Sequence, residues 1–131
     1  MRKIKGLIIM LFISLSLFGM TACSDGGTNS YEQITPQEAK TIMDTESEYI
    51  IIDARTTEEF AEGHIADAIL IPEYEIAARA EKELSDKDAL ILVYCRSGRR
   101  SKIASEELVK LGYTNVKDFG GIIDWPYEVV K

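Results

Sequence analysis

One cysteine followed by a cluster of arginines is the part of this sequence whose residue types could carry out chemistry. Residues 93–101 read VYCRSGRRS, so that Cys95 precedes Arg96, Arg99 and Arg100. A cysteine sulfur reacts as the thiolate, and neighbouring cations favour the thiolate over the thiol. The segment therefore predicts a nucleophilic cysteine, and the alternative is a buried core cysteine followed by a solvated basic turn.

Other cysteine chemistries find little support in the chain. It contains two cysteines, Cys23 and Cys95, and no C-x-x-C motif, so the second sulfur of a dithiol redox site is missing. The single histidine and Cys95 do not have the spacing of a metal site. We therefore expect no metal.

The first 22 residues have the layout of a secretory signal peptide. Three basic residues precede an apolar run over residues 7–18, and small residues follow it. This run is shorter than the roughly 20 residues of a membrane-spanning helix, which favours export over a permanent span. Residues 20–23, MTAC, resemble the bacterial lipobox, and the resemblance implies a lipid on Cys23. The alternative is a secreted protein in which Cys23 is unmodified or removed.

Lipidation of Cys23 would anchor the mature protein to the bacterial cell envelope, on the outer face of the cytoplasmic membrane or on the periplasmic side. Residues 23–30 would form a flexible tether, because they offer no large apolar residues to bury. Without the three basic residues of the leader, the chain keeps 12 of its 15 basic and all 22 acidic residues, a net charge of −10. Such an acidic protein is not expected to bind nucleic acid. We expect a monomer whose membrane contact is the lipid.

The elements that must position Cys95 can be placed from apolar patterns in residues 31–131, which we expect to form one domain. Continuous apolar runs rich in β-branched residues are typical of strands buried on both faces. Such runs occupy residues 49–53 and 89–94, with further candidates at 69–71 and 116–119. Apolar residues at helical spacing predict a helix through Ile76, Ala80 and Leu84 and another over 101–111. Strands that alternate with helices predict an α/β domain with a mainly parallel sheet.

Two further helix signals are local. Thr35, Pro36 and Glu38 have the pattern of a helix start with a capping box. Gly112 follows the helix over 101–111 at the position of a C-cap.

This order of elements places the cysteine segment at a functional edge of the sheet. A strand ends at Tyr94 and a helix is expected from Ser101, so residues 95–100 form the turn between them. Ligands of open α/β sheets bind at the carboxyl ends of the strands. Gly98 allows backbone angles that let the turn curl with its N–H groups toward the sulfur, and the positive end of the helix lies nearby.

The segment 95–101, CRSGRRS, resembles the active-site loop of single-domain rhodaneses. Other segments are similar to the family's pattern in the same order, and together they cover nearly all of residues 31–130: IDAR at 52–55, EF at 59–60, GHI at 63–65, AILIP at 68–72, LGYTNV at 111–116, GGI at 120–122, and Trp125. The resemblance implies a rhodanese-like single domain with a central sheet and helices on both faces.

The resemblance also implies sulfur transfer. Cys95 would attack a thiosulfate-like donor, become a persulfide, and pass the sulfur to a thiol or cyanide acceptor. No metal or organic cofactor is implied. The expected residues are Cys95 as nucleophile; Arg96, Ser97, Gly98, Arg99, Arg100 and Ser101 for binding a small anionic donor; and Asp53, Arg55 and His64 as structural support of the loop. Glu59 is expected on a solvated or bracing helix face.

Two alternatives stay open. Cysteine phosphatases and arsenate reductases carry a C-x5-R loop, but position 101 is serine here and Arg100 comes one residue early. The second alternative is a tethered, non-catalytic binding module with the same fold, but the presence of Cys95 favours the enzyme. The sequence departs from the family at Asp67, where a glycine is common, although aspartate tolerates left-handed backbone angles.

Overall fold

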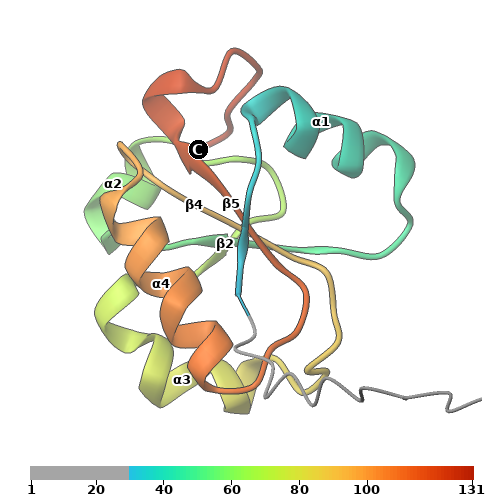
Figure 1. Cartoon of the computed structure of the whole chain (residues 1–131). Coiled ribbons are helices and arrows are strands. Elements are labelled where there is room, and N and C mark those ends of the chain that lie inside the picture. Colours follow the sequence, from blue (N-terminus) through green and yellow to red (C-terminus); the bar gives the residue numbers. More distant parts are fainter. Residues whose placement is uncertain (1–29) are drawn as a thin grey trace, which may run out of the picture.

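The computed structural model describes residues 30–131 (Figure 1). The predicted signal peptide, Cys23 and all but the last residue of the tether lie outside these residues. The described chain contains five strands in one sheet, and every pair of neighbouring strands runs parallel. The elements follow in the order β1 (Glu32–Gln33), α1 (Pro36–Thr45), β2 (Ile50–Asp53), α2 (Thr57–Glu62), β3 (Ile69–Leu70), α3 (Ile76–Glu83), β4 (Ile91–Cys95), α4 (Arg99–Lys110) and β5 (Val116–Gly121).

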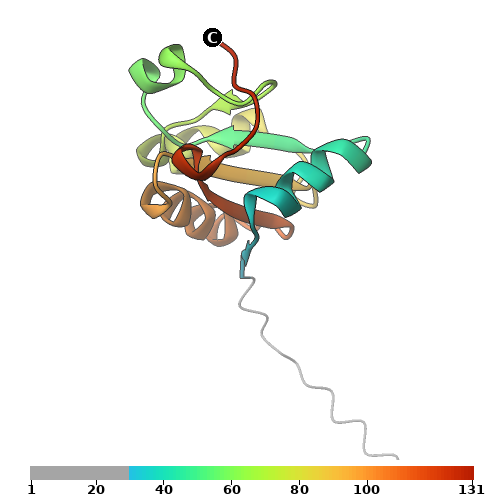
Figure 2. The ribbon, with the colours of Figure 1, turned by 90° about the horizontal axis from the view of Figure 1, so that it is seen from above.

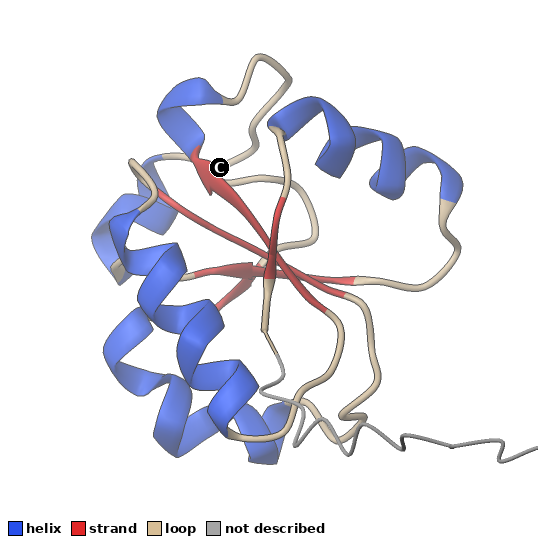
Figure 3. Ribbon diagram, in the orientation of Figure 1, coloured by secondary structure: helices blue, strands red, loops and turns tan. Residues whose placement is uncertain are grey.

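The sheet is covered on both faces, as the predicted fold class requires. Figures 1 and 3 show the sheet nearly edge-on, with α1 on one side and α3 and α4 on the other. Residues of one strand alternate between the two cores, because successive side chains of a strand point to opposite faces. Leu92 packs with Ala39 of α1, whereas Val93 packs with Ala80 of α3 and Leu108 of α4.

The strand order is β1-β5-β4-β2-β3, so that β4 lies in the middle of the sheet. All five carboxyl ends meet at one edge, and Cys95 is the last residue of β4. Cys95 pairs with Gly121 on the neighbouring strand β5, and the pairing of the two strands is irregular between Val93 and Cys95. The cysteine therefore sits at the carboxyl edge predicted from the sequence.

Helix α4 begins earlier than the sequence predicted. It starts at Arg99 instead of Ser101, because Gly98 adopts φ 107° and completes the turn by itself. Its end is as predicted: Gly112 has φ 96°, its N–H donates to the Val109 carbonyl, and the next N–H donates to the Leu108 carbonyl. The loop between β4 and α4 is therefore only three residues long.

Two smaller predictions are confirmed and one element was missed. The capping box of Thr35 and Glu38 opens α1, and Asp67 has the left-handed φ of 66° that its place in a turn requires. Strand β1 has two exposed residues and lacks the apolar run by which the other strands were found.

Candidate active site

Cys95 lies buried at the base of the loop between β4 and α4. The residue is 1% exposed, and its Sγ accepts a hydrogen bond of 3.0 Å from the N–H of Gly98. It forms no disulfide within the described residues. An N–H aimed at sulfur, at the first turn of a helix, favours a negative charge on that atom. Of the inward N–H groups expected from the sequence, that of Gly98 is the one that reaches Sγ.

The loop rests directly on the end of β5. A Cβ at Gly121 would lie 2.6 Å from Ser97 Cα and closer still to the Arg96 carbonyl, so only glycine fits there. The N–H of Ile123 donates to the Arg96 carbonyl at 3.2 Å. The glycine pair in the GGI segment was the sequence signal for this close approach, and it identifies β5 as the second wall of the site.

The residues expected to bind an anionic donor divide into exposed and inward-facing groups. Arg96, Ser97 and Arg99 are exposed, and neither arginine forms an ion pair with any residue between 30 and 131. Ser101 is buried, and its Oγ donates to the Gly98 carbonyl at 3.1 Å and lies 3.4 Å from the Gly120 carbonyl. The Ser101 side chain therefore braces the loop from inside, and its expected role as a substrate ligand stays a prediction.

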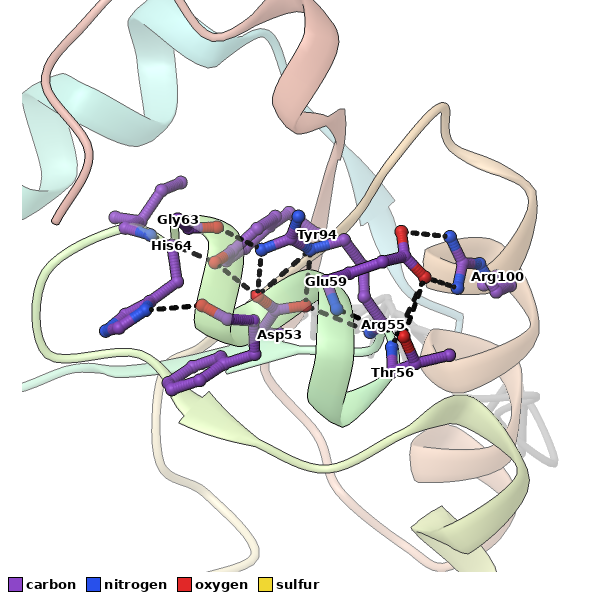
Figure 4. Close-up of polar contacts among 10 residues, drawn as sticks. Asp53, Arg55, Thr56, Glu59, Gly63, His64, Tyr94 and Arg100 are labelled. Carbon is purple, nitrogen blue, oxygen red and sulfur yellow. Dashed lines mark hydrogen bonds and ion pairs between the residues drawn. The ribbon is translucent and has the colours of Figure 1, made fainter. Parts of the chain in front are cut away.

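Arg100, expected to bind the donor, faces a carboxylate in this structure. Its guanidinium makes a two-pronged ion pair with Glu59 of α2, with Nη1–Oε1 and Nη2–Oε2 distances of 2.6 and 3.0 Å (Figure 4). Bonding to Arg100 lowers the pKa of Glu59 to about 2. Glu59 in addition forms the capping box of α2 with Thr56. Arg100 is thus committed to fastening α2 to α4, and Glu59 has the bracing role that was one of its two expectations.

A buried polar network supports the backbone beside Cys95. Asp53, fully buried, accepts bonds of 3.0 and 2.8 Å from Nε and Nη2 of Arg55 and one of 2.7 Å from the hydroxyl of Tyr94 (Figure 4). Burial raises the pKa of Tyr94, and the Asp53 carboxylate adds to the rise, so the hydroxyl keeps its proton as a donor. The predicted Asp53–Arg55 pair is present, and Tyr94, the neighbour of Cys95, is a member that the sequence did not single out.

The network continues into the turn after α2. Arg55 Nη2 donates to the carbonyl of Gly63 at 2.6 Å, and the N–H of Ile65 donates to the Tyr94 hydroxyl at 3.1 Å. This pattern joins the end of β2, the end of β4 and the turn into one unit.

His64 belongs to that turn and not to the sulfur. Its Nδ1 lies 3.0 Å from the Phe60 carbonyl, its ring stacks on the Phe60 ring at 3.7 Å, and its backbone pairs with Val130. The histidine therefore holds the turn after α2 against the C-terminal segment. Its support of the cysteine loop is indirect, through Gly63 and Arg55.

Two other kinds of site were sought in the part of the chain that the structure describes, a metal site and a membrane span. No group of three histidine, cysteine, aspartate or glutamate side chains between residues 30 and 131 is arranged to hold a metal ion. In the same range, no helix has both the length and the hydrophobicity needed to span a membrane. The arrangement is that of a buried cysteine under a helix start, on a loop that also carries two exposed arginines without ion-pair partners in residues 30–131.

This combination of fold and cysteine loop defines a known class of domain. The model of the rhodanese-like domain family matches residues 35–126, and the chain belongs to that family. The predicted family and fold class are thus confirmed.

Particular relatives carry sulfurtransferase names. Thiosulfate sulfurtransferase PspE of Escherichia coli K12 is 39% identical over 80 residues, which cover 61% of this chain and 77% of the relative. A sulfurtransferase of Allochromatium vinosum is 40% identical over 85 residues, which cover 64% and 77%. Among solved structures, a rhodanese with anions from E. coli has a TM-score of 0.60 at 37% identity and covers 63% of this chain and 98% of its own. A rhodanese-related protein from Thermoplasma volcanium has a TM-score of 0.65 at 33% identity, with coverage of 76% and 98%.

Proposed function

We propose that this protein is a sulfurtransferase that carries a sulfur atom as a persulfide on Cys95, from a thiosulfate-like donor to a thiol or cyanide acceptor. The observation that carries the proposal is the 3.0 Å hydrogen bond from the Gly98 N–H to the buried Cys95 Sγ, at the start of α4. Sulfurtransferase relatives at about 40% identity support the same conclusion.

The reaction needs no electron donor or acceptor beyond the two substrates. In the first half, the Cys95 thiolate attacks the outer sulfur of thiosulfate, a new S–S bond forms, and sulfite leaves with the electron pair of the broken bond. In the second half, an acceptor thiolate or cyanide attacks the outer sulfur of the persulfide. The S–S bond to Cys95 then breaks, and the Cys95 thiolate is restored with its electron pair.

The loop suits both halves because sulfur carries negative charge in each. The Gly98 N–H and the first turn of α4 stabilise that charge in the thiolate, and the same groups are positioned to stabilise the persulfide. Arg96 and Arg99 are exposed and unpaired within residues 30–131, so they are available to the sulfonate end of the donor. Arg100 has no such role in the proposal, because Glu59 occupies it.

The proposal is tested by treating the purified protein with thiosulfate and measuring its intact mass. We expect the mass of one sulfur atom to be added, and expect Cys95→Ser to abolish the addition. Arg99→Gln should raise the thiosulfate concentration that is needed for half-maximal sulfur loading. Lys110→Gln removes an exposed cation at the far end of α4 and should leave that concentration unchanged. A protein that binds thiosulfate without gaining sulfur would be a binding module, and hydrolysis of p-nitrophenyl phosphate would favour a phosphatase.

We also propose that the domain works at the cell envelope, anchored by a lipid on Cys23. The proposal rests on the basic, apolar and small-residue order of residues 1–22 and on the lipobox-like MTAC segment. Mass spectrometry of the mature N-terminus tests it: a lipid-modified Cys23 as first residue is expected. A mature chain with a free or missing Cys23 would overturn the anchor and leave the catalytic proposal unaffected.

A further inference from the structure

An exposed apolar residue, Ile123, lies next to the cysteine loop. A 3-10 turn, Ile122–Asp124, follows β5 directly and lies beside the loop between β4 and α4 in both ribbon views (Figures 1 and 2). Ile123 in this turn is 62% exposed, one of the most exposed large apolar side chains among residues 30–131. Its N–H donates to the Arg96 carbonyl, so a backbone hydrogen bond ties the residue to the loop.

The loop itself carries two exposed cations. Arg96 and Arg99 are exposed there without ion-pair partners in the described residues. A small anionic donor is recognised by charge and gains nothing from an isoleucine. The apolar side chain therefore has no use in the first half of the reaction, whereas it could contact the substrate of the second half.

Three cavities of the described chain lie away from the loop: between α1 and the C-terminal segment, beside β1, and at the amino ends of the strands. None of them has Cys95 or Ile123 in its wall. These three cavities offer an acceptor no place beside Cys95, whereas the side chain of Ile123 is exposed next to the loop.

We propose that Ile123 is a specificity residue for the acceptor, and that the acceptor is a thiol with an apolar substituent next to its sulfur. The inference rests on the proposed sulfur transfer through Cys95. The acceptor thiolate attacks the outer sulfur of the persulfide, forms a new S–S bond, and releases Cys95 as thiolate, while its apolar substituent packs on Ile123. Donor and acceptor would then react at the same sulfur but contact different side chains.

The test measures discharge of a preformed persulfide. Purified protein is loaded with thiosulfate, freed of excess donor, and mixed with 2-phenylethanethiol, with 2-mercaptoethanol or with cyanide. The informative quantity is the ratio of the two thiol rates, and cyanide provides a reference for the amount of competent persulfide. We expect wild-type protein to prefer the apolar thiol and Ile123→Ser to lower the ratio about tenfold, as loss of about half an isoleucine contact predicts.

Matched variants separate the inference from loss of folding. Ile123→Leu keeps an apolar side chain and should retain the wild-type ratio. Ile69→Ser makes the same polar change in β3, two strands away from β4, and should retain it as well. An unchanged ratio in Ile123→Ser, or an equal fall in Ile69→Ser, overturns the inference alone. Absence of any persulfide in wild-type protein overturns the proposed function and this inference with it.

Discussion

Replacing Glu59 by glutamine tests whether its ion pair with Arg100 fastens α2 to α4. Glu59→Gln keeps the length of the side chain and an acceptor for the capping box with Thr56, but it removes the charge. Bonding to Arg100 lowers the pKa of Glu59 from 4.5 to about 2, which corresponds to at most about 3.4 kcal/mol. The two side chains remain 21% and 24% exposed, so solvent screening reduces the expected loss to about 1–2 kcal/mol.

The expected loss depends on pH with a defined sign. Folding lowers the pKa of Glu59, so the stabilisation is complete above about pH 4.5 and disappears as the pH falls toward 2. Urea unfolding of wild type and Glu59→Gln at pH 7 should therefore show the full difference in free energy of unfolding. At about pH 3 more than half of that difference should be gone, because the carboxyl of the unfolded wild-type chain is already protonated.

Glu38→Gln is the matched control. Glu38 forms the capping box of α1 and accepts a 2.7 Å bond from the Thr35 N–H, but it has no ion-pair partner within residues 30–131. Its replacement should change the free energy of unfolding by less than about 0.5 kcal/mol at either pH. Equal losses in the two variants, or a Glu59→Gln loss that is the same at pH 7 and pH 3, would refute the structural role assigned to Arg100.

Two further perturbations address the walls of the site. Gly121→Ala should lower the free energy of unfolding by about 1–3 kcal/mol and slow persulfide formation, because its Cβ would overlap the Arg96 carbonyl. Gly112→Ala, at φ 96° with no neighbour within 4 Å of the new Cβ, should cost about 1–2 kcal/mol without slowing the reaction; equal slowing would contradict the close approach of loop and strand. Asp53→Asn should cost about 3–5 kcal/mol in urea unfolding, because Arg55 is left buried and unpaired, and a loss below about 1 kcal/mol would contradict that burial.

The sequence predicted those elements whose signal is carried by their own residues. Strands β2 and β4 are continuous apolar runs because both of their faces are buried, and they were found within two residues of their observed bounds. Gly112, just after the end of α4, was also predicted, because the left-handed backbone that terminates a helix favours glycine locally. Strand β1 was missed because two exposed residues on the sheet edge carry no apolar pattern.

The position of the candidate nucleophile could be predicted from the sequence, whereas the partners of the loop arginines could not. Strand end, cysteine and glycine turn are neighbours in sequence, so the place of Cys95 followed from local order. The partner of Arg100 is 41 residues away, and nothing in the RSGRR segment distinguishes this paired arginine from exposed Arg96 and Arg99. Glu59 was expected on a solvated or bracing helix face, but only the packing of α2 on α4 shows which cation it meets.

The most direct test of sulfur transfer through Cys95 follows a labelled sulfur atom. Protein is incubated with thiosulfate labelled in its outer sulfur, digested without reductant, and its peptides are analysed by mass spectrometry. The label is expected on the peptide that contains Cys95, and it should leave that peptide when cyanide or a thiol is added. A label that stays on the protein after acceptor is added, or that binds equally to the Cys95→Ser variant, would contradict the account.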